Sequence, residues 1–166
     1  MQFSIPEQRT VKLRNFQNRA EHHGQDWVYA FTAHLKMTAK ADALDLLDPA
    51  LRVMFWDGDA VRSHKLKGPT FDLTGIELVG WELRVDRATA PIIIGGCKVD
   101  AFEFQPKDEG IVDLLFKVHG HCDDEATRGV LAGLINHDIS IQLIAPQTEL
   151  PLGEQTPLDA LAGATS

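Results

Sequence analysis

Two histidines separated by one glycine, His119 and His121, stand just before an acidic stretch of the chain. Because side chains alternate along a strand, both imidazoles would face one side and form a pair that can chelate a metal ion. A zinc site needs three or four ligands, so the others would come from His22 and His23 or from His137. The simpler interpretation is a polar strand end before a helix, with solvated histidines in a turn. We therefore predict no metal and no other cofactor.

A second pattern is typical of nucleic-acid recognition. In the predicted strand Val11–Arg19, the residues Lys12, Arg14 and Phe16 share one face. Cations on a sheet face bind phosphates, and an exposed ring between them stacks on a base of a single strand. The alternative is that Phe16 belongs to the core and that the basic loops are merely solvated. The predicted nucleic-acid-binding residues are Lys12, Arg14, Phe16, Arg19, Arg62, Lys65, Lys67 and Arg84.

No motif of the chain indicates catalysis. The serines do not stand in a Gly-x-Ser-x-Gly turn, and neither cysteine lies in a protease-like context. The chain also lacks the Gly-x-x-x-x-Gly-Lys and Gly-x-Gly-x-x-Gly patterns of phosphate-binding loops. We therefore expect a binding protein that is not an enzyme.

The charge of the chain is uneven along its length. The net charge is −8, yet the first hundred residues carry as many basic as acidic side chains, so the excess acid lies towards the C-terminus. This distribution leaves room for a local basic face and also suggests a second function, binding to a basic protein partner such as a host enzyme or defence complex. The acidic residues of that alternative are Asp108, Glu109, Asp113, Asp123, Asp124 and Glu125.

A third possible function is that of a structural subunit of a particle. A discrete high-order oligomer in solution would support this function. Otherwise we expect a low-order homo-oligomer, because exposed sheet edges tend to pair.

Length and composition indicate one globular domain. The chain has 166 residues, of which 44% are hydrophobic and 24% charged, values ordinary for soluble proteins. It has no apolar run of the 18 residues that a membrane helix needs and no signal-peptide pattern at the start, so we expect a cytoplasmic protein without membrane contact. Cys97 and Cys122 occur in unrelated contexts and are expected to be reduced thiols.

Hydrophobic periodicity predicts the elements that must position these residues. Strict alternation over Trp27–Thr38 predicts a strand in a hairpin with Val11–Arg19, and helical spacing over Ala41–Trp56 predicts a short helical turn that restarts at Pro49. An acidic start predicts a helix from Asp123 to about Asn136. The other predicted strands are Leu73–Val79, Trp81–Arg87, Ile92–Ile94 joined to Cys97–Phe104 through a kink at Gly95-Gly96, Ile111–His119 and Ile139–Ile144.

These elements predict a mostly β, α+β domain over residues 1–145. Their order is ββα, two to four strands, ββα, β, which favours an antiparallel barrel or sandwich with two helices, either OB-like or built from a duplicated ββα unit. The duplication would superpose Lys12 on Lys98, Phe16 on Phe102 and Gly24 on Gly110; two ordinary hairpins are the alternative. Residues 146–166 are expected to form a flexible tail.

Five segments carry a resemblance to small phage and prophage proteins. They are residues 11–24, Trp27–Met37, Leu46–Arg52, Cys97–Phe104 and Phe116–Val118, and the resemblance covers about residues 11–145. Such proteins occur near phage DNA replication and recombination genes. The resemblance implies a role in handling single-stranded DNA in the host cytoplasm, and it assigns no functional residue.

Overall fold

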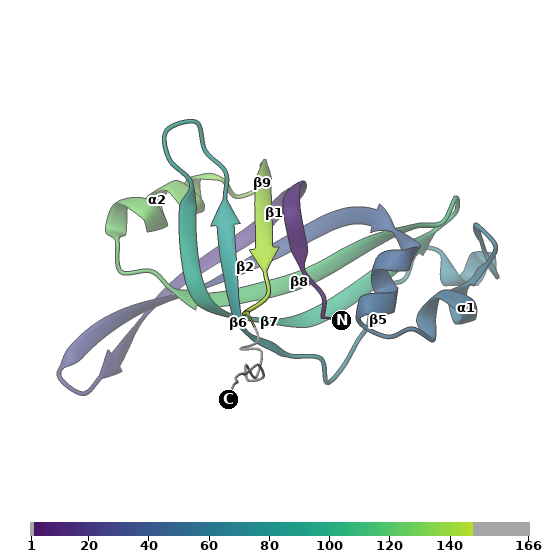
Figure 1. Cartoon of the computed structure of the whole chain (residues 1–166), viewed down its shortest axis with the longest axis horizontal. Helices are drawn as coiled ribbons and strands as arrows, with labels where there is room; N and C mark the ends of the chain where they lie inside the picture. Colours follow the sequence, from purple (N-terminus) through teal and green to yellow (C-terminus); the bar gives the residue numbers. More distant parts are fainter. Residues whose placement is uncertain (1, 148–166) are drawn as a thin grey trace, which may run out of the picture.

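The computed structural model describes residues 2–147, and the predicted tail from residue 148 onward lies outside the described residues. Long antiparallel strands dominate it, with α1 and α2 at opposite ends of the long axis (Figure 1). The elements are β1 (Ile5–His23), β2 (Asp26–Lys40), η1 (Ala41–Leu46), α1 (Leu51–Phe55), β3 (Trp56–Asp57), β4 (Ala60–Val61), η2 (His64–Leu66), β5 (Phe71–Asp72), β6 (Leu78–Val85), β7 (Ile92–Lys107), β8 (Ile111–His121), α2 (Glu125–Gly133) and β9 (Asp138–Ile144). The predicted mostly β class is confirmed.

The pairings of the large sheet join its six long strands into a ring. The order is β7-β6-β9-β1-β2-β8, and β8 pairs again with β7, while β5 adds a short pairing to β7. Each of the six long strands therefore has a partner on both sides. The expectation of an oligomer rested on exposed edges, and most of these edges are satisfied within the chain.

The β1–β2 hairpin is the longest local feature of the fold. The two strands stay paired to His23 opposite Asp26, whereas the pairing of β2 with β8 stops at Ala30 opposite His121. The end of the hairpin therefore extends past its neighbours (Figure 1). Trp27 begins the alternating apolar positions of β2, yet its side chain is 60% exposed because it lies on this projecting end.

A β-bulge in β1 decides which side chains reach the core. Leu13 pairs with Leu35 and Asn15 with His34, so β1 has one extra residue at this point. The extra residue changes which side chains face inward. Leu13 and Phe16 are both buried, and Phe16 stacks on Phe31 with ring centroids 5.4 Å apart. The prediction of Phe16 as an exposed stacking ring is therefore wrong, and the core alternative is confirmed.

The second long hairpin has the same irregularity. β7 gains one residue between Asp100 and Glu103 against β8, and Val99 and Phe102 both point into the core. Both hairpins also turn at a glycine with φ of +66°, Gly24 and Gly110, a conformation that glycine adopts without strain. The hairpins therefore share a turn glycine with positive φ, a bulge and a buried phenylalanine at matching positions.

The remaining elements follow the predicted pattern, with the helices shorter and the strands β7, β8 and β9 longer than predicted. The restart near Pro49 is confirmed, since η1 ends at Leu46 and α1 begins at Leu51, and the C-terminal helix is confirmed as α2. Residues 73–77 form a loop instead of the predicted strand, because β7 changes partner from β6 to β5 beside them. Among residues 2–147 no helix is long and apolar enough to cross a membrane.

The two cysteines are free and buried. Burial raises the pKa of Cys97 to about 11, so its thiol stays protonated and unreactive at neutral pH. Both cysteines of the described residues are thus unpaired thiols that belong to the hydrophobic core.

Candidate nucleic-acid interface

A basic groove lies on the outer face of β1 and β2. Lys12 pairs directly with Lys36, so these two ammonium groups project from neighbouring strands on the same side. The bulge then places Arg14 and Asn15 beside His34. The groove has a volume of about 390 Å³. Its lining residues are Lys12, Arg14, Asn15, His34, Lys36 and Asn136.

Lys117 extends the basic groove onto β8. It pairs directly with His34 across the β2–β8 ladder. Burial lowers the pKa of His34, and the charges of Lys117 and Arg14 lower it further. The imidazole is therefore mostly neutral at pH 7. Cations from both flanking strands therefore border His34, Arg14 on β1 and Lys117 on β8.

Most of the groove's cations have no acidic partner. Within residues 2–147, Lys12, Arg14 and Lys117 form no ion pair with any described carboxylate, although Asp138 lies opposite Lys12 and Asp100 lies opposite Lys117 in the backbone ladders. Lys36 differs, because its Nζ lies 3.7 Å from Asp113 Oδ2. The groove therefore combines uncompensated positive charge with an open hollow, which suits an anionic ligand.

The buried carboxylate below Lys36 gives a testable property. Asp113 is 1% exposed, accepts a hydrogen bond from Thr38 Oγ1 at 2.8 Å, and lies 2.7 Å from Lys107 Nζ. Burial raises the pKa of Asp113, but Lys107, Thr38 and Lys36 outweigh it, so its pKa lies below the ordinary value. Because folding lowers this pKa, the ionised carboxylate of Asp113 stabilises the folded state. The stabilisation is complete above the unfolded pKa of about 3.9 and is lost as the pH falls through the lower folded pKa.

We expect Asp113→Asn to lower the free energy of unfolding by about 2 kcal/mol at pH 7, because a charged hydrogen-bonded group is lost. The variant should also lose less stability than the parent between pH 5 and pH 2. Urea unfolding at several pH values measures both effects. Asp108→Asn is the control, since the Asp108–Lys67 ion pair is half exposed and, screened by solvent, should contribute little to stability. Parallel pH profiles for Asp113→Asn and the parent would contradict the assignment.

Arg19 lies on the same outer face as the groove, nearer the projecting hairpin end. Its Nε donates a hydrogen bond to Glu21 Oε2 at 2.7 Å, and this contact lowers the pKa of that carboxyl. Its Nη1 lies 3.4 Å from Thr32 Oγ1. The charge of Arg19 is therefore partly compensated within the chain, unlike that of Arg14.

The other predicted cations lie on different elements. Arg62 donates from Nε to the Val53 carbonyl beside α1, Lys65 is exposed on η2, and Lys67 pairs with Asp108 at the β7–β8 turn. Arg84 lies on β6 and pairs with Glu82. The structure thus brings Lys12 and Arg14 together in the groove and does not bring these four residues to it.

His119 belongs to a hydrogen-bonded row across three strands. Its Nδ1 lies 2.9 Å from Thr32 Oγ1 and its Nε2 lies 2.7 Å from Asp100 Oδ1. Hydroxyl, imidazole and carboxylate are the groups of a nucleophilic triad. However, Thr32 is only 6% exposed, and it lies on a strand paired on both sides. The row therefore links β2, β8 and β7 by side-chain hydrogen bonds, and its hydroxyl end is buried.

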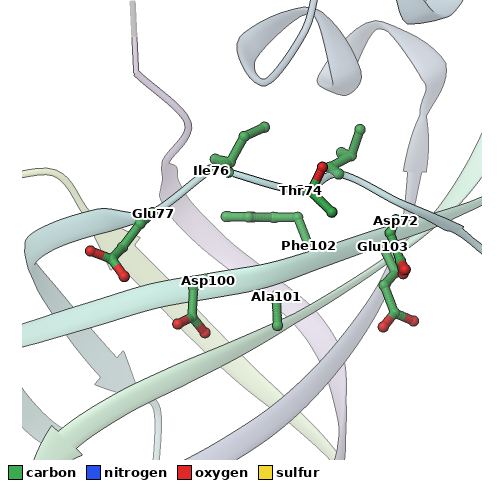
Figure 2. A pocket seen from close by; sticks show the side chains of 10 residues that line it. Asp72, Thr74, Ile76, Glu77, Asp100, Ala101, Phe102 and Glu103 are labelled. Atoms are coloured by element: carbon green, nitrogen blue, oxygen red, sulfur yellow. The ribbon is translucent and has the colours of Figure 1, made fainter.

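A larger hollow of about 590 Å³ has the opposite charge. Figure 2 shows Asp72, Glu77, Asp100 and Glu103 around it, where β7 bulges beside the loop before β6. Ala101 adopts a φ of +55° at this bulge, a conformation rarely found outside glycine. Glu77 and Asp100 both approach Lys98 Nζ, at 3.5 and 3.6 Å. The four carboxylates make this hollow unsuited to an anionic ligand.

The acidic residues predicted for a protein partner do not form one surface. Asp108 and Glu109 lie before β8 and Asp123 and Asp124 after it, so the eleven-residue strand separates them. Most of them have internal partners. Asp123 accepts a hydrogen bond from the Tyr29 amide, and Asp124 accepts one from Thr127 Oγ1.

His34, Lys36 and Lys117 carry no motif in the sequence that marks them as binding residues. The alternation of β2 placed His34 and Lys36 on its polar face, but that pattern alone did not show which residues of β1 and β8 lie opposite them. The pairing registers supply this information.

Comparisons with protein-family models, with curated proteins and with solved structures give no match. The functional assignment therefore depends on the geometry of the chain's own residues.

Proposed function

We propose that this protein binds single-stranded DNA across the outer face of β1, β2 and β8. Lys12, Arg14, Lys36 and Lys117 would contact phosphates. The observation that supports this most is the set of cations without carboxylate partners around the basic groove. Phosphate contacts of this kind supply most of the affinity in nucleic-acid binding, even for a protein whose net charge is negative.

The shape of the groove favours a single strand over a duplex. A duplex is read by a helix or a projecting ribbon that enters one of its grooves. The basic groove lies on the paired body of the sheet, and the projecting hairpin end carries Glu21 and Asp26. A flexible single strand can lie across the sheet, with its phosphates on the cations. Since Phe16 is buried, the planar group within the groove is His34, and imidazole rings also stack on bases.

A role in phage replication or recombination is what the sequence resemblance implies, and we include it in the proposal. The function is non-enzymatic binding. The alternative of a basic protein partner finds less support, because the acids that would recognise it are distributed over both ends of β8.

Fluorescence anisotropy with labelled oligonucleotides tests the proposal. The full chain is titrated against single-stranded and double-stranded oligonucleotides at low and at moderate salt. We expect preferential binding to the single strand, with an affinity that falls steeply with salt, by a slope of about −0.7 for each phosphate contact.

Two single variants locate the interface. Arg14→Ala removes a groove cation and should weaken binding, whereas Lys65→Ala removes an exposed cation on η2 and should leave it unchanged. Equal losses in both variants would show that the basic groove is not the contact surface. No binding even at low salt would overturn the proposed function, and a search for a protein partner would follow.

A further inference from the structure

We propose that Glu21, His23 and His121 form a binding site for a divalent transition metal ion such as Zn²⁺. The site lies on the outer face of the sheet, where β1 extends past the end of β8. Glu21 and His23 come from β1, and His121 is the last residue of β8. The three candidate ligand atoms all lie within 4.8 Å of one another. This site is separate from the basic groove and does not depend on the proposed function.

The strand register explains why these side chains meet across an intervening strand. Ala30 on β2 pairs with Arg19 on one side and with His121 on the other. Directly paired residues project to the same face. Because Ala30 is small, the longer side chains of β1 and β8 can approach each other above it.

The distances fit metal coordination better than direct hydrogen bonding. Glu21 Oε1 lies 3.5 Å from His23 Nε2 and 3.6 Å from His121 Nε2. A strong hydrogen bond between a charged imidazole and a carboxylate would be about 2.7–2.9 Å long. Two ligands of a tetrahedral zinc ion, each about 2.0–2.1 Å from the metal, lie about 3.3–3.4 Å apart. Small rotations of these exposed side chains would complete that geometry.

Arg19 orients the carboxylate of the proposed site. Its Nε holds Glu21 Oε2 at 2.7 Å and leaves Oε1 directed towards the two imidazoles. Supporting hydrogen bonds of this type fix metal ligands in place, and their loss lowers metal affinity by about 10- to 100-fold. Arg19 thus holds Oε2 of Glu21, and Oε1 remains available to bind a metal ion.

The donor set selects the class of ion. Two imidazole nitrogens and one carboxylate oxygen suit zinc and its neighbours in the first transition row and do not suit Mg²⁺ or Ca²⁺, which prefer oxygen ligands. Three protein ligands leave a fourth position for water or an anion. A hollow of about 220 Å³ lies beside the site, and Arg19, Lys98 and His119 contribute to its lining.

Cobalt and zinc titrations of the full chain test the proposal. Co²⁺ is used as a spectroscopic probe, because four-coordinate cobalt gives intense visible bands that six-coordinate cobalt lacks. We expect one equivalent of Co²⁺ to produce these bands and Zn²⁺ to abolish them by displacement. Calorimetry with Zn²⁺ alone should give the same stoichiometry.

The variants separate ligands from neighbouring residues. Glu21→Gln, His23→Asn and His121→Asn should each lower the affinity by at least the roughly 10- to 100-fold that loss of a supporting group costs. His22→Asn is the matched control, because His22 is exposed and its ring packs on Trp27 with centroids 4.7 Å apart. This variant should bind Co²⁺ like the parent.

Two results would overturn the proposal. One is the absence of tetrahedral cobalt bands in the parent chain, and the other is an equal loss of affinity in His22→Asn and His121→Asn. All the replaced side chains are exposed or half-buried, and circular dichroism of each variant verifies that the fold persists. Because the readout is metal binding, it is independent of whether the chain binds DNA.

Discussion

The double variant Arg14→Glu and Lys117→Glu is expected to bind single-stranded DNA at least about 100-fold more weakly than the parent. Each charged hydrogen bond to a phosphate contributes about 1.5 kcal/mol, so loss of two contacts costs about 3 kcal/mol. Both residues border His34 and neither has a carboxylate partner among the described residues. The reversal therefore replaces attraction by repulsion in the middle of the basic groove. The salt dependence should also become shallower by about 1.4, because two phosphate contacts are lost.

A matched reversal on other elements controls for net charge. Lys65→Glu with Arg84→Glu changes the total charge by the same amount, but these residues lie on η2 and β6. We expect it to weaken binding only slightly, through long-range repulsion that salt screens. A loss as large as that of the groove variant would mean that the protein responds to net charge alone, and the assignment of the groove would be wrong. Anisotropy at two salt concentrations distinguishes these results.

Replacing Gly120 by alanine is expected to lower the free energy of unfolding by about 2–3 kcal/mol. Gly120 pairs with Phe31 across the β2–β8 ladder, and an added Cβ would lie 2.9 Å from Phe31 Cε2 and 3.1 Å from Cys97 Sγ. Both neighbours are fully buried. Phe31 cannot move freely, because it is stacked on Phe16. An added methyl group in such a core forces displacement of neighbouring groups, which costs about 1–3 kcal/mol.

Two further variants show that crowding causes the effect. Gly129→Ala adds the same methyl group within α2, where nothing lies within 4 Å of it, and it should be neutral or stabilising by up to about 1 kcal/mol. Combining Gly120→Ala with Phe31→Leu should cost less than the sum of the single changes, since the smaller side chain leaves room. Strict additivity in urea unfolding would show that the ring is not the source of the strain.

The alternation of the second strand made most of the sheet predictable. Phe31, Ala33, Leu35 and Met37 recur at every second position and are all buried. The polar and glycine residues between the two strands predicted the hairpin turn. The change from alternating to helical hydrophobic spacing after Lys40 predicted the short helices η1 and α1. The strand order was not predictable, because pairings such as β1 with β9 join segments that are far apart in the sequence.

One inserted residue explains why only part of the site could be predicted. In a strand without a bulge, Lys12 and Arg14 would lie on the same face as Phe16. Phe16 pairs with Ala33 in the core, so both cations would then point inward. The extra residue near Asn15 turns the two cations outward and leaves the phenyl ring inside. A bulge has no reliable sequence signature here, so alternation correctly located basic residues on β1 and incorrectly placed an aromatic ring among them. The proposed metal ligands could not be predicted for a similar reason. Glu21 and His121 lie close together only because β1 and β8 pair with β2 in a particular register.

The pairing of β1 with β9 also constrains how the molecule is assembled. Val11 lies opposite Ile139 and Lys12 opposite Asp138, so the first long strand receives its second neighbour only when the last one has been made. During synthesis the two hairpins can form early from local contacts, but β1 keeps a bare hydrogen-bonding edge until β9 leaves the ribosome. Contacts between such distant segments slow folding, and a bare edge exposed meanwhile favours self-association. The nascent chain is therefore most vulnerable to aggregation before the strand 138–144 is complete.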